Sequence, residues 1–430
     1  MSDRSVMVGS RPGKIDNGAS GDSRFLFGMV VLQQRQHHFA MPVPECLRRS
    51  ISLPSLTRDL AVVIGLALLW LAAGITAGAA EPMPAPPAGS AVAVNGRLAT
   101  RGNMLVNAAG EPVQLRGVAL HGLQWFGDFY RDGRVIDAAA TDWGADVVRI
   151  AVYLHEGGYL QQEAAGREDV ESIIDTIVRR CAQAGIYVVL DWHVHHPGDP
   201  LLFIDDAREF FGTMAARYAD LPNVIYEIAN EPNRTGLAGV APERVVRWAD
   251  LRAYADEIIP VIRDRSPAAL VLVGTPDWCS FGFSGGQDWR EVLDTPLAHP
   301  NVAYVVHAYA AGHTFHAAID EIADRLPLFV TEWAAASWQR TSTNDLVKSQ
   351  PWIELFDRRG ISWTYWNFCP GDGVFGCFVD GTTSDDSLMP DSPRVSETGK
   401  LVYLLLNTPR DRWQLPLGGS AASQRSKPQP

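Results

Sequence analysis

The sequence lacks clusters of basic residues. Its 430 residues include 37 Lys or Arg against 49 Asp or Glu, which gives a formal net charge of −12. Binding to nucleic-acid phosphates requires clustered Lys and Arg, and no run of basic residues with interleaved aromatics occurs. The charge balance therefore argues against a nucleic-acid partner, and it is compatible with a neutral substrate.

Paired cysteine motifs are missing as well. The five cysteines are Cys46, Cys181, Cys279, Cys369 and Cys377, and none belongs to a CxxC pair. A structural zinc site is therefore not expected. Cys369 and Cys377 lie in the Gly-rich stretch CPGDGVFGC and would close a short loop by a disulfide in an exported chain. Two unpaired thiols are the alternative.

Charge is absent from one long segment. Residues 60–80 form an apolar run with Arg48, Arg49 and Arg58 before it and small residues at its end. This pattern predicts an export signal, and we favour its cleavage. The run could also span a bilayer, so an uncleaved membrane anchor is the alternative. In both cases the rest of the chain is expected outside, secreted or on the outer face of the cell membrane.

The segments that flank this signal show no pattern of a folded unit. Residues 1–59 form a polar extension, in which Met41 is the more usual position for a start. Residues 81–94, with EPMPAPPAGS, predict a Pro-rich linker, and residues 409–430 a disordered tail. Residues 95–408 remain as a single domain without an internal repeat.

Eight short apolar runs alternate with longer segments of helical periodicity, such as 170–185 and 243–264. Runs rich in Val, Ile and Leu indicate strands buried on both faces, as in parallel sheets. The alternation predicts an α/β fold, a (β/α)8 TIM barrel. A doubly wound sheet would need a Gly-rich phosphate turn after its first strand, and none occurs. The runs are 113–120, 146–154, 186–194, 223–231, 269–274, 301–309, 327–333 and 361–368.

The ends of these runs carry polar or aromatic residues. Barrel enzymes place functional residues where the strands end, so these side chains are expected to converge. Glu231 ends the fourth run in ANEP, and Glu332 ends the seventh in TEW. Paired carboxylates across a barrel mouth are typical of glycosidic cleavage, whereas a single Glu would suggest a salt bridge. The other residues at or near these ends are His121, Arg149, His193, Asn230, Trp278, His307, Tyr309 and Trp366.

Thirteen Trp residues are present, and several lie beside polar residues at the predicted strand ends. A flat apolar face next to hydrogen-bonding groups suits a sugar ring. We therefore expect such tryptophans to face a ligand, with core packing as the alternative. They are Trp125, Trp192, Trp278, Trp333 and Trp366.

Several segments together resemble the bacterial endo-β-1,4-glucanase branch of glycoside hydrolase family 5, over roughly residues 95–405. They are LRGVALHGLQWFGDFY, VVRIAVYL, VVLDWHVHHPGDP, VIYEIANEP, LVGTPDW, VVHAYA, FVTEW and SWTYWNF. The resemblance implies hydrolysis of β-1,4-glucan with retention at the anomeric carbon, without a cofactor or a metal, by a chain expected to be monomeric. Mannan, xyloglucan and mixed-linkage glucan are alternative substrates.

The resemblance also implies a role for each site residue. Glu231 would be the acid/base and Glu332 the nucleophile, supported by Arg149 and Tyr309. Asn230 would hold the sugar 2-hydroxyl beside His193 and His307, and His121, Trp125, Tyr153, Trp278 and Trp366 would bind substrate. One departure is the stretch NFCPGDGVFGCF, which lacks the Lys that close relatives use for a distal sugar.

Two functions of other classes remain open. A non-catalytic carbohydrate-binding barrel would fit the aromatic residues, although such proteins usually lose one of the two acids. His193 and His195 form an HxH pair, a spacing that binds a divalent metal in amidohydrolase barrels. That arrangement needs HxH on the first strand, whereas here the pair is on the third.

Overall fold

The computed structural model describes residues 83–236 and 244–409. The predicted extension, the signal or anchor segment at 60–80 and residues 410–430 of the predicted tail lie outside the described residues. Within the described ranges, no helix is long and apolar enough to cross a membrane. The start of the predicted linker, residues 81–82, is also outside the described part.

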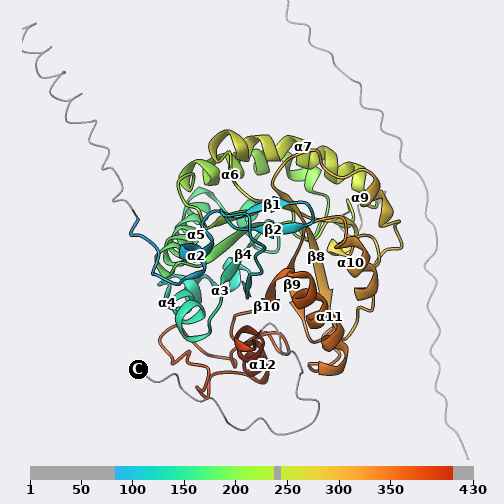
Figure 1. Cartoon of the computed structure of the whole chain (residues 1–430). Coiled ribbons are helices and arrows are strands. Elements are labelled where there is room, and N and C mark those ends of the chain that lie inside the picture. The colour runs from blue at the N-terminus through green and yellow to red at the C-terminus, as the bar shows by residue number, and fades with distance from the viewer. Residues whose placement is uncertain (1–82, 237–243, 410–430) are drawn as a thin grey trace, which may run out of the picture. The chain divides into compact units, whose positions relative to one another are not determined.

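Eight parallel strands close into a barrel, as the sequence predicts (Figure 1). Each of the eight apolar runs coincides with one strand, although the strand of the seventh run extends one residue beyond it, and neighbours in sequence are neighbours in the barrel. The strands are β3 (Arg116–Leu120), β4 (Val147–Tyr153), β5 (Tyr187–His193), β6 (Val224–Glu227), β7 (Val271–Val273), β8 (Val302–Tyr309), β9 (Leu328–Ala334) and β10 (Ser362–Trp366).

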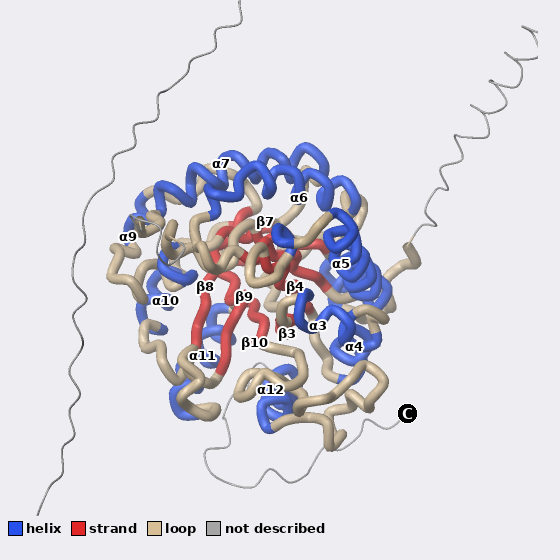
Figure 2. Tube along the Cα trace, turned by 180° about the vertical axis from the view of Figure 1, so that it is seen from behind, coloured by secondary structure: helices blue, strands red, loops and turns tan. Residues whose placement is uncertain are grey.

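Helices surround the strands (Figure 2). In α5 (Ala164–Ala184), the buried Ile173, Ile174 and Ile177 lie at helical spacing, and Gly185 ends the helix in the left-handed conformation with φ 73°. The helix α7 (Trp248–Arg265) begins five residues after the start of the segment predicted for it. Among the described residues, the other helices of at least seven residues are α3 (Leu123–Tyr130), α6 (Ile204–Arg217), α10 (His316–Ile322), α11 (Leu346–Arg359) and α12 (Glu397–Asn407).

A small hairpin closes the end of the barrel at which the strands begin. The strands β1 (Ala99–Arg101) and β2 (Met104–Val106) pair antiparallel and lie across the strands in Figure 1. Leu98 and Leu105 join one apolar cluster with residues from the first half of the barrel strands. The short helix α2 (Ala91–Asn95) adds the buried Val92, so the predicted linker at 81–94 extends too far. Residues 91–94 belong to the folded unit because this apolar contact fixes them.

Strand β9 contains a bulge. Between the pairs Val305↔Phe329 and His307↔Glu332, two steps along β8 correspond to three along β9. The register between β9 and β10 also shifts, between Trp363 and Tyr365 of β10. An extra residue in one strand changes which face of the sheet the following side chains point to. The bulge therefore allows two consecutive residues of β9, Thr331 and Glu332, to contact side chains of the barrel interior.

Candidate active site

Arg149 on β4 is the centre of a charged layer in the barrel interior. It is fully buried, and its Nε and Nη2 donate to the two oxygens of Glu227 at 2.8 and 3.1 Å. Its Nη2 also lies 2.9 Å from Asp191 Oδ2 and donates to Asn230 Oδ1 at 2.6 Å. The Asn230 amide is thereby oriented with its oxygen on the guanidinium. A buried cation with these partners is a fixed electrostatic support for the residues above it.

The sequence predicts Glu231 at the end of its strand, whereas in the structure Glu231 lies beyond that end. Strand β6 ends at Glu227, and the next four residues run alongside the end of β5. Asn230 N donates to Trp192 O at 3.2 Å, and Glu231 N donates to Val194 O at 3.0 Å. These backbone bonds hold the Glu231 side chain over the open end of the barrel, where 9% of the residue is exposed.

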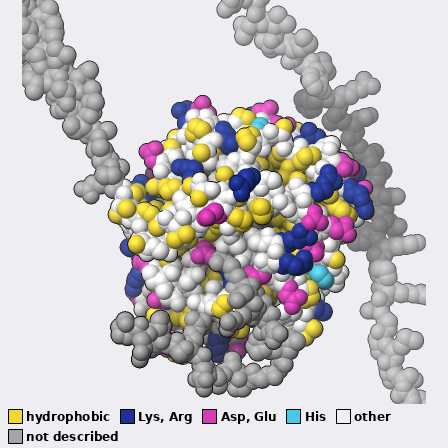
Figure 3. Space-filling model, in the orientation of Figure 1, with side chains coloured by type: hydrophobic (Ala, Val, Ile, Leu, Met, Phe, Trp, Pro, Cys, Tyr) yellow, Lys and Arg dark blue, Asp and Glu magenta, His cyan; other side chains and the backbone are white. Residues whose placement is uncertain are grey.

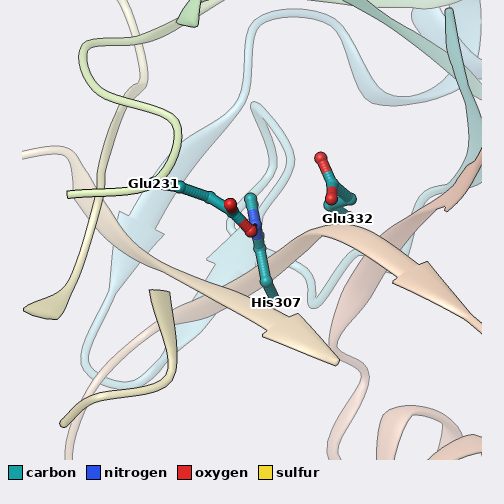
Figure 4. A group of neighbouring side chains, drawn as sticks. All are labelled: Glu231, His307 and Glu332. Atoms are coloured by element: carbon teal, nitrogen blue, oxygen red, sulfur yellow. Dashed lines mark hydrogen bonds and ion pairs between the residues drawn. The ribbon is translucent and has the colours of Figure 1, made fainter. Parts of the chain in front are cut away.

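Glu332 lies opposite, within β9, and is 4% exposed. Its Oε2 accepts from Arg149 Nη1 at 3.3 Å, and its Oε1 accepts from the Tyr309 hydroxyl. One oxygen of Glu332, one oxygen of Glu231 and a ring nitrogen of His307 all lie within 4.8 Å of one another (Figure 4). The two acids therefore meet in one site.

Burial dominates the protonation of this pair. It raises the pKa of Glu231 and of Glu332, and the charge of Glu231 raises that of Glu332 further. The two acids titrate as a pair, so one proton is retained more readily than by isolated carboxyls. Glu332 is contacted by the Arg149 cation and a hydroxyl donor, which favours its ionised form. The retained proton therefore belongs on Glu231.

An aromatic wall lines one side of the acids. The rings of Tyr153 and His193 are 3.9 Å apart, and Trp366 stacks on His193 at 6.0 Å. The ring of His121 is 4.9 Å from that of Trp366 and 5.2 Å from that of Trp125. Trp125 remains 48% exposed, whereas the other four rings are buried. The structure thus brings four predicted substrate-binding residues together with His193, which was predicted as a supporting residue.

Trp278 follows β7 in a left-handed turn. Asp277, Trp278 and Cys279 have φ values of 56°, 56° and 54°. This conformation is strained for residues other than glycine, and such strain is often found at functional sites. Trp278 N donates to Pro232 O at 3.0 Å, and Cys279 Sγ donates to Asn230 O at 2.7 Å. The partly exposed Trp278 is therefore fixed to the segment that carries Glu231.

Two of the five tryptophans predicted to face a ligand do not. Trp192 and Trp333 are fully buried and pack outward against helices. Their rings lie 4.7 Å from Phe210 on α6 and 5.6 Å from Phe356 on α11. They are core residues because their strand neighbours face the interior and adjacent side chains in a strand alternate.

The predicted disulfide between Cys369 and Cys377 is not formed; both are free, buried thiols. Cys369 Sγ points instead to Asn367 Oδ1, at 2.9 Å. An ion pair connects this loop to the loop after β9, since Arg340 Nη1 lies 2.6 Å from Asp372 Oδ1. Asn367 Nδ2 donates to the other oxygen of Asp372 at 2.7 Å. Polar contacts thus hold the loop in place of a covalent bond.

Four polar residues of the site were not predicted from the sequence. Asp191 and Glu227 lie inside strand runs, and Thr331 precedes Glu332. The signal was an acid within an otherwise apolar run, in YVVLDWH and NVIYEIANE. His195 had been considered only as a metal ligand. Its Nδ1 lies 2.8 Å from Glu156 Oε1, and its Nε2 lies 3.8 Å from Glu231 Oε2.

Glu231, His307 and Glu332 are close enough to converge on a divalent cation. However, His307 Nδ1 and Glu231 Oε1 already form a hydrogen bond of 2.8 Å with each other. The HxH pair does not converge either, because His193 Nδ1 contacts Asp191 at 2.6 Å and His195 contacts Glu156. These side chains thus form hydrogen bonds with neighbouring side chains. They therefore fit a pair of acids, each with its own hydrogen-bonding partners, better than a metal site.

Comparisons with known proteins agree with this geometry. The family model described as cellulase (glycosyl hydrolase family 5) matches residues 106–372. Endoglucanase MaCel5A of Microbulbifer sp. (strain ALW1) is 39% identical over 302 residues, which cover 69% of this chain and 56% of that protein. Endoglucanase E-5 of Thermobifida fusca is 38% identical over 304 residues, covering 70% and 62%. The chain thus spans less than two thirds of the length of these two relatives.

Solved structures show the same fold. The catalytic domain of Thermobifida fusca endoglucanase Cel5A (E5) superposes with a TM-score of 0.68 at 35% identity, covering 74% of this chain and 100% of that domain. A variant of that domain in complex with cellotetraose gives a TM-score of 0.67, also at 35% identity.

Proposed function

The chain belongs to the cellulase family of glycosyl hydrolases, family 5, and from this premise we propose that it is a retaining endo-β-1,4-glucanase. One observation carries the proposal. Two buried carboxylic acids face each other across the open end of the barrel, with oxygens within 4.8 Å. Retaining glycosidases hold their carboxyl groups about 5–5.5 Å apart, whereas inverting enzymes need about 6.5–9.5 Å for an intervening water. The separation supports retention.

In the first half of the reaction, the Glu332 carboxylate attacks the anomeric carbon. The glycosidic C–O bond breaks, and its electron pair goes to the leaving oxygen, which takes the proton of Glu231. The leaving sugar departs with a free hydroxyl, and a glycosyl ester on Glu332 remains. Arg149 and Tyr309 keep Glu332 ionised before the attack. Burial of Glu231 keeps its proton available.

In the second half, Glu231 acts as the base. A water gives its proton to the Glu231 carboxylate while its oxygen attacks the anomeric carbon, and Glu332 leaves as a carboxylate. Asn230 is oriented for the sugar 2-hydroxyl, because its oxygen is held by Arg149 and one of its amide hydrogens is directed to Val194 O at 3.3 Å. Its second amide hydrogen remains for the substrate.

The aromatic wall is proposed to hold the sugars on the non-reducing side of the cleaved bond. Trp366, His121 and Trp125 form this side, and Trp278 supports the leaving-group side. The complex of a structural relative with cellotetraose favours a glucan oligosaccharide as ligand. Mannan, xyloglucan and mixed-linkage glucan remain the competing substrates.

A reducing-sugar assay on carboxymethylcellulose, mannan and xyloglucan tests the proposal, with the natural chain and its Glu332→Ala variant side by side. We expect release from carboxymethylcellulose by the natural chain and a loss of several orders of magnitude in the variant. The first anomer released should have the configuration of the substrate bond. Activity on mannan with none on glucan would overturn the proposed substrate, and release of the opposite anomer would overturn retention.

Glu231→Gln separates the enzyme from a non-catalytic binding barrel. An enzyme loses turnover in this variant, whereas a binder keeps its affinity and has no turnover to lose. Full activity after strong chelation would exclude a catalytic metal, which is the second alternative. Both measurements use the same purified chain.

We propose further that the chain is exported and acts as a monomer. The apolar run at residues 60–80, preceded by arginines, supports export by a cleaved signal or an uncleaved anchor. N-terminal sequencing of protein recovered from medium and membrane fractions distinguishes the two forms. Retention of the full chain in the cytoplasm would contradict export. Light scattering of the purified protein tests the monomer.

A further inference from the structure

Burial alone does not explain why the acid/base proton stays on Glu231, because a histidine whose charged form opposes that proton also faces this residue. Glu231 Oε2 lies 3.8 Å from His195 Nε2. Burial opposes the charge of His195, but its hydrogen bond with Glu156 and the nearby Glu231 raise its pKa above the ordinary value. A charged His195 favours the ionised form of Glu231. The opposite side of Glu231 therefore decides whether the proton stays.

That side consists of a chain of hydrogen bonds, which we call the Glu227–Thr331–His307 chain. Thr331 Oγ1 lies 2.9 Å from Glu227 Oε1 and 3.1 Å from His307 Nε2. His307 Nδ1 lies 2.8 Å from Glu231 Oε1. All four residues are buried, so the proton positions in this chain are constrained by the partners present.

The donor and the acceptor of each hydrogen bond in this chain can be assigned from Glu227, the residue farthest from Glu231. Glu227 accepts two N–H bonds from Arg149, and its Oε1 also accepts from the Thr331 hydroxyl. The single hydroxyl hydrogen of Thr331 is therefore donated to Glu227. Thr331 Oγ1 must then accept from His307, so the Nε2 of His307 carries the hydrogen.

The hydrogen bond between His307 and Glu231 can be assigned in the same way. Burial, the largest effect, lowers the pKa of His307 to about 4. At neutral pH, only one of its two ring nitrogens therefore carries a hydrogen. With that hydrogen on Nε2, Nδ1 is an acceptor, and the 2.8 Å contact to Glu231 requires a hydrogen from the carboxyl group. We propose that Glu227 and Thr331 are positioning residues that fix the Nε2–H tautomer of His307 and thereby hold the catalytic proton on Glu231.

Other titratable groups also face Glu231. His195 and Arg149 favour its anion, and so does His196 when charged. Glu332 and Asp191 repel that anion when they are themselves ionised. Tyr153, Tyr309 and Cys279 are neutral neighbours with raised pKa values, chiefly through burial. None of them replaces the Glu227–Thr331–His307 chain, because none contacts His307 Nε2.

Thr331→Val tests the chain. It removes the hydroxyl that receives the Nε2 hydrogen, so the tautomer with the hydrogen on Nδ1 becomes favourable and donates to a Glu231 carboxylate. The pKa of Glu231 then falls. We expect the alkaline limb of kcat/KM to move to lower pH by about half to one unit, the value of one hydrogen bond. Thr331→Ser keeps the hydroxyl and should restore the natural profile.

Two further variants control for a merely structural effect. Thr364→Val removes another buried hydroxyl, which donates to the backbone oxygen of Thr331 and contacts no carboxylate. It should leave the alkaline limb in place. His195→Gln removes the cation on the other side of Glu231 and should move the alkaline limb to higher pH. An equal shift in Thr331→Val and Thr364→Val would overturn the proposal.

A direct readout does not depend on activity. Nitrogen NMR of protein with ¹⁵N-labelled histidine distinguishes Nε2–H from Nδ1–H, and His307→Gln identifies the signal of His307 among the 11 histidines. We expect Nε2–H in the natural chain and in Thr331→Ser, and Nδ1–H in Thr331→Val. The inference rests on the proposed acid/base role of Glu231 for its consequence, but the tautomer can be measured in an inactive protein. Nδ1–H in the natural chain would overturn it even if glucan is hydrolysed, whereas inactivity with Nε2–H would overturn only the proposed function.

Discussion

In the barrel interior, a step of two residues along a strand leads from apolar side chains to charged ones. On β5, Val189 belongs to the apolar cluster at the closed end and Asp191 to the charged layer. On β6, Ile225 and Glu227 are related in the same way. All four are almost completely buried, so exposure to water does not distinguish the two layers.

The difference lies in what each layer needs to be stable. The apolar layer gains free energy from burial itself. The charged layer loses solvation and is tolerable only because Arg149 is paired with several acids at once. Figure 3 shows basic and acidic side chains intermingled on the outer face seen there. Charge inside the barrel is different, because it is concentrated beneath two carboxylates that need fixed partners.

The largest expected effect separates function from stability. Glu332→Gln should lower kcat by several orders of magnitude, because the nucleophile is lost. It should leave the melting temperature unchanged or raise it, because a buried charge disappears. Hydrolysis rates and thermal unfolding of the same preparation measure both. A variant that loses activity only because it unfolds would break the distinction between the layers.

Arg149→Met is expected to destabilise the fold by about 3–5 kcal/mol, since it leaves Asp191 and Glu227 buried without their cation. Urea unfolding gives the free energy. The triple variant with Asp191→Asn and Glu227→Gln should recover much of the stability but not the activity. If Arg149→Met alone were as stable as the natural chain, the charged layer would not depend on pairing.

The aromatic wall above the charged layer should also make the free energy of unfolding depend on pH. Burial lowers the pKa of His121 from 6.5 to about 4, so between these values the unfolded chain takes up a proton that the folded chain does not. Stability from this group is therefore complete above about pH 6.5 and is lost as the pH falls towards 4, by an amount on the order of 3 kcal/mol. Glu231 and Glu332 act with the opposite sign, because their raised pKa values favour proton uptake by the folded chain.

His121→Gln isolates this contribution. Urea unfolding at several pH values between 4 and 7 should give a flatter dependence for the variant than for the natural chain. An unchanged slope would show that His121 is protonated in the folded state as readily as in the unfolded state, and that its burial has no electrostatic consequence.

The smallest effect belongs to the apolar layer. Ile225→Val should cost about 0.5–1.5 kcal/mol, because one buried methylene is removed, and kcat should not change. Urea unfolding and the hydrolysis assay measure these two quantities. A marked fall in kcat would show that the closed end of the barrel transmits packing changes to the acids, against the separation proposed here.

The sequence predicts every barrel strand because each is a short apolar run between helical segments. It also predicts the two acids, because polar residues stand out where such runs end. Asp191 and Glu227 were missed because only the ends of the runs were considered. Alternation could have found them: Asp191 lies two residues before His193 on β5, so both face the same side. The same rule excludes Trp192, which lies between them, as a ligand-facing residue.

What the sequence by itself determined is the barrel, its eight strands and the residue types that meet at its open end, because these follow from periodicity within each segment. Only the tertiary structure decided that Thr331 and Glu332, adjacent in sequence, both contact interior residues. That outcome requires the bulge in β9, and a bulge exists only relative to the registers of β8 and β10. Register between strands distant in sequence depends on the closed barrel as a whole, so no local pattern could reveal it.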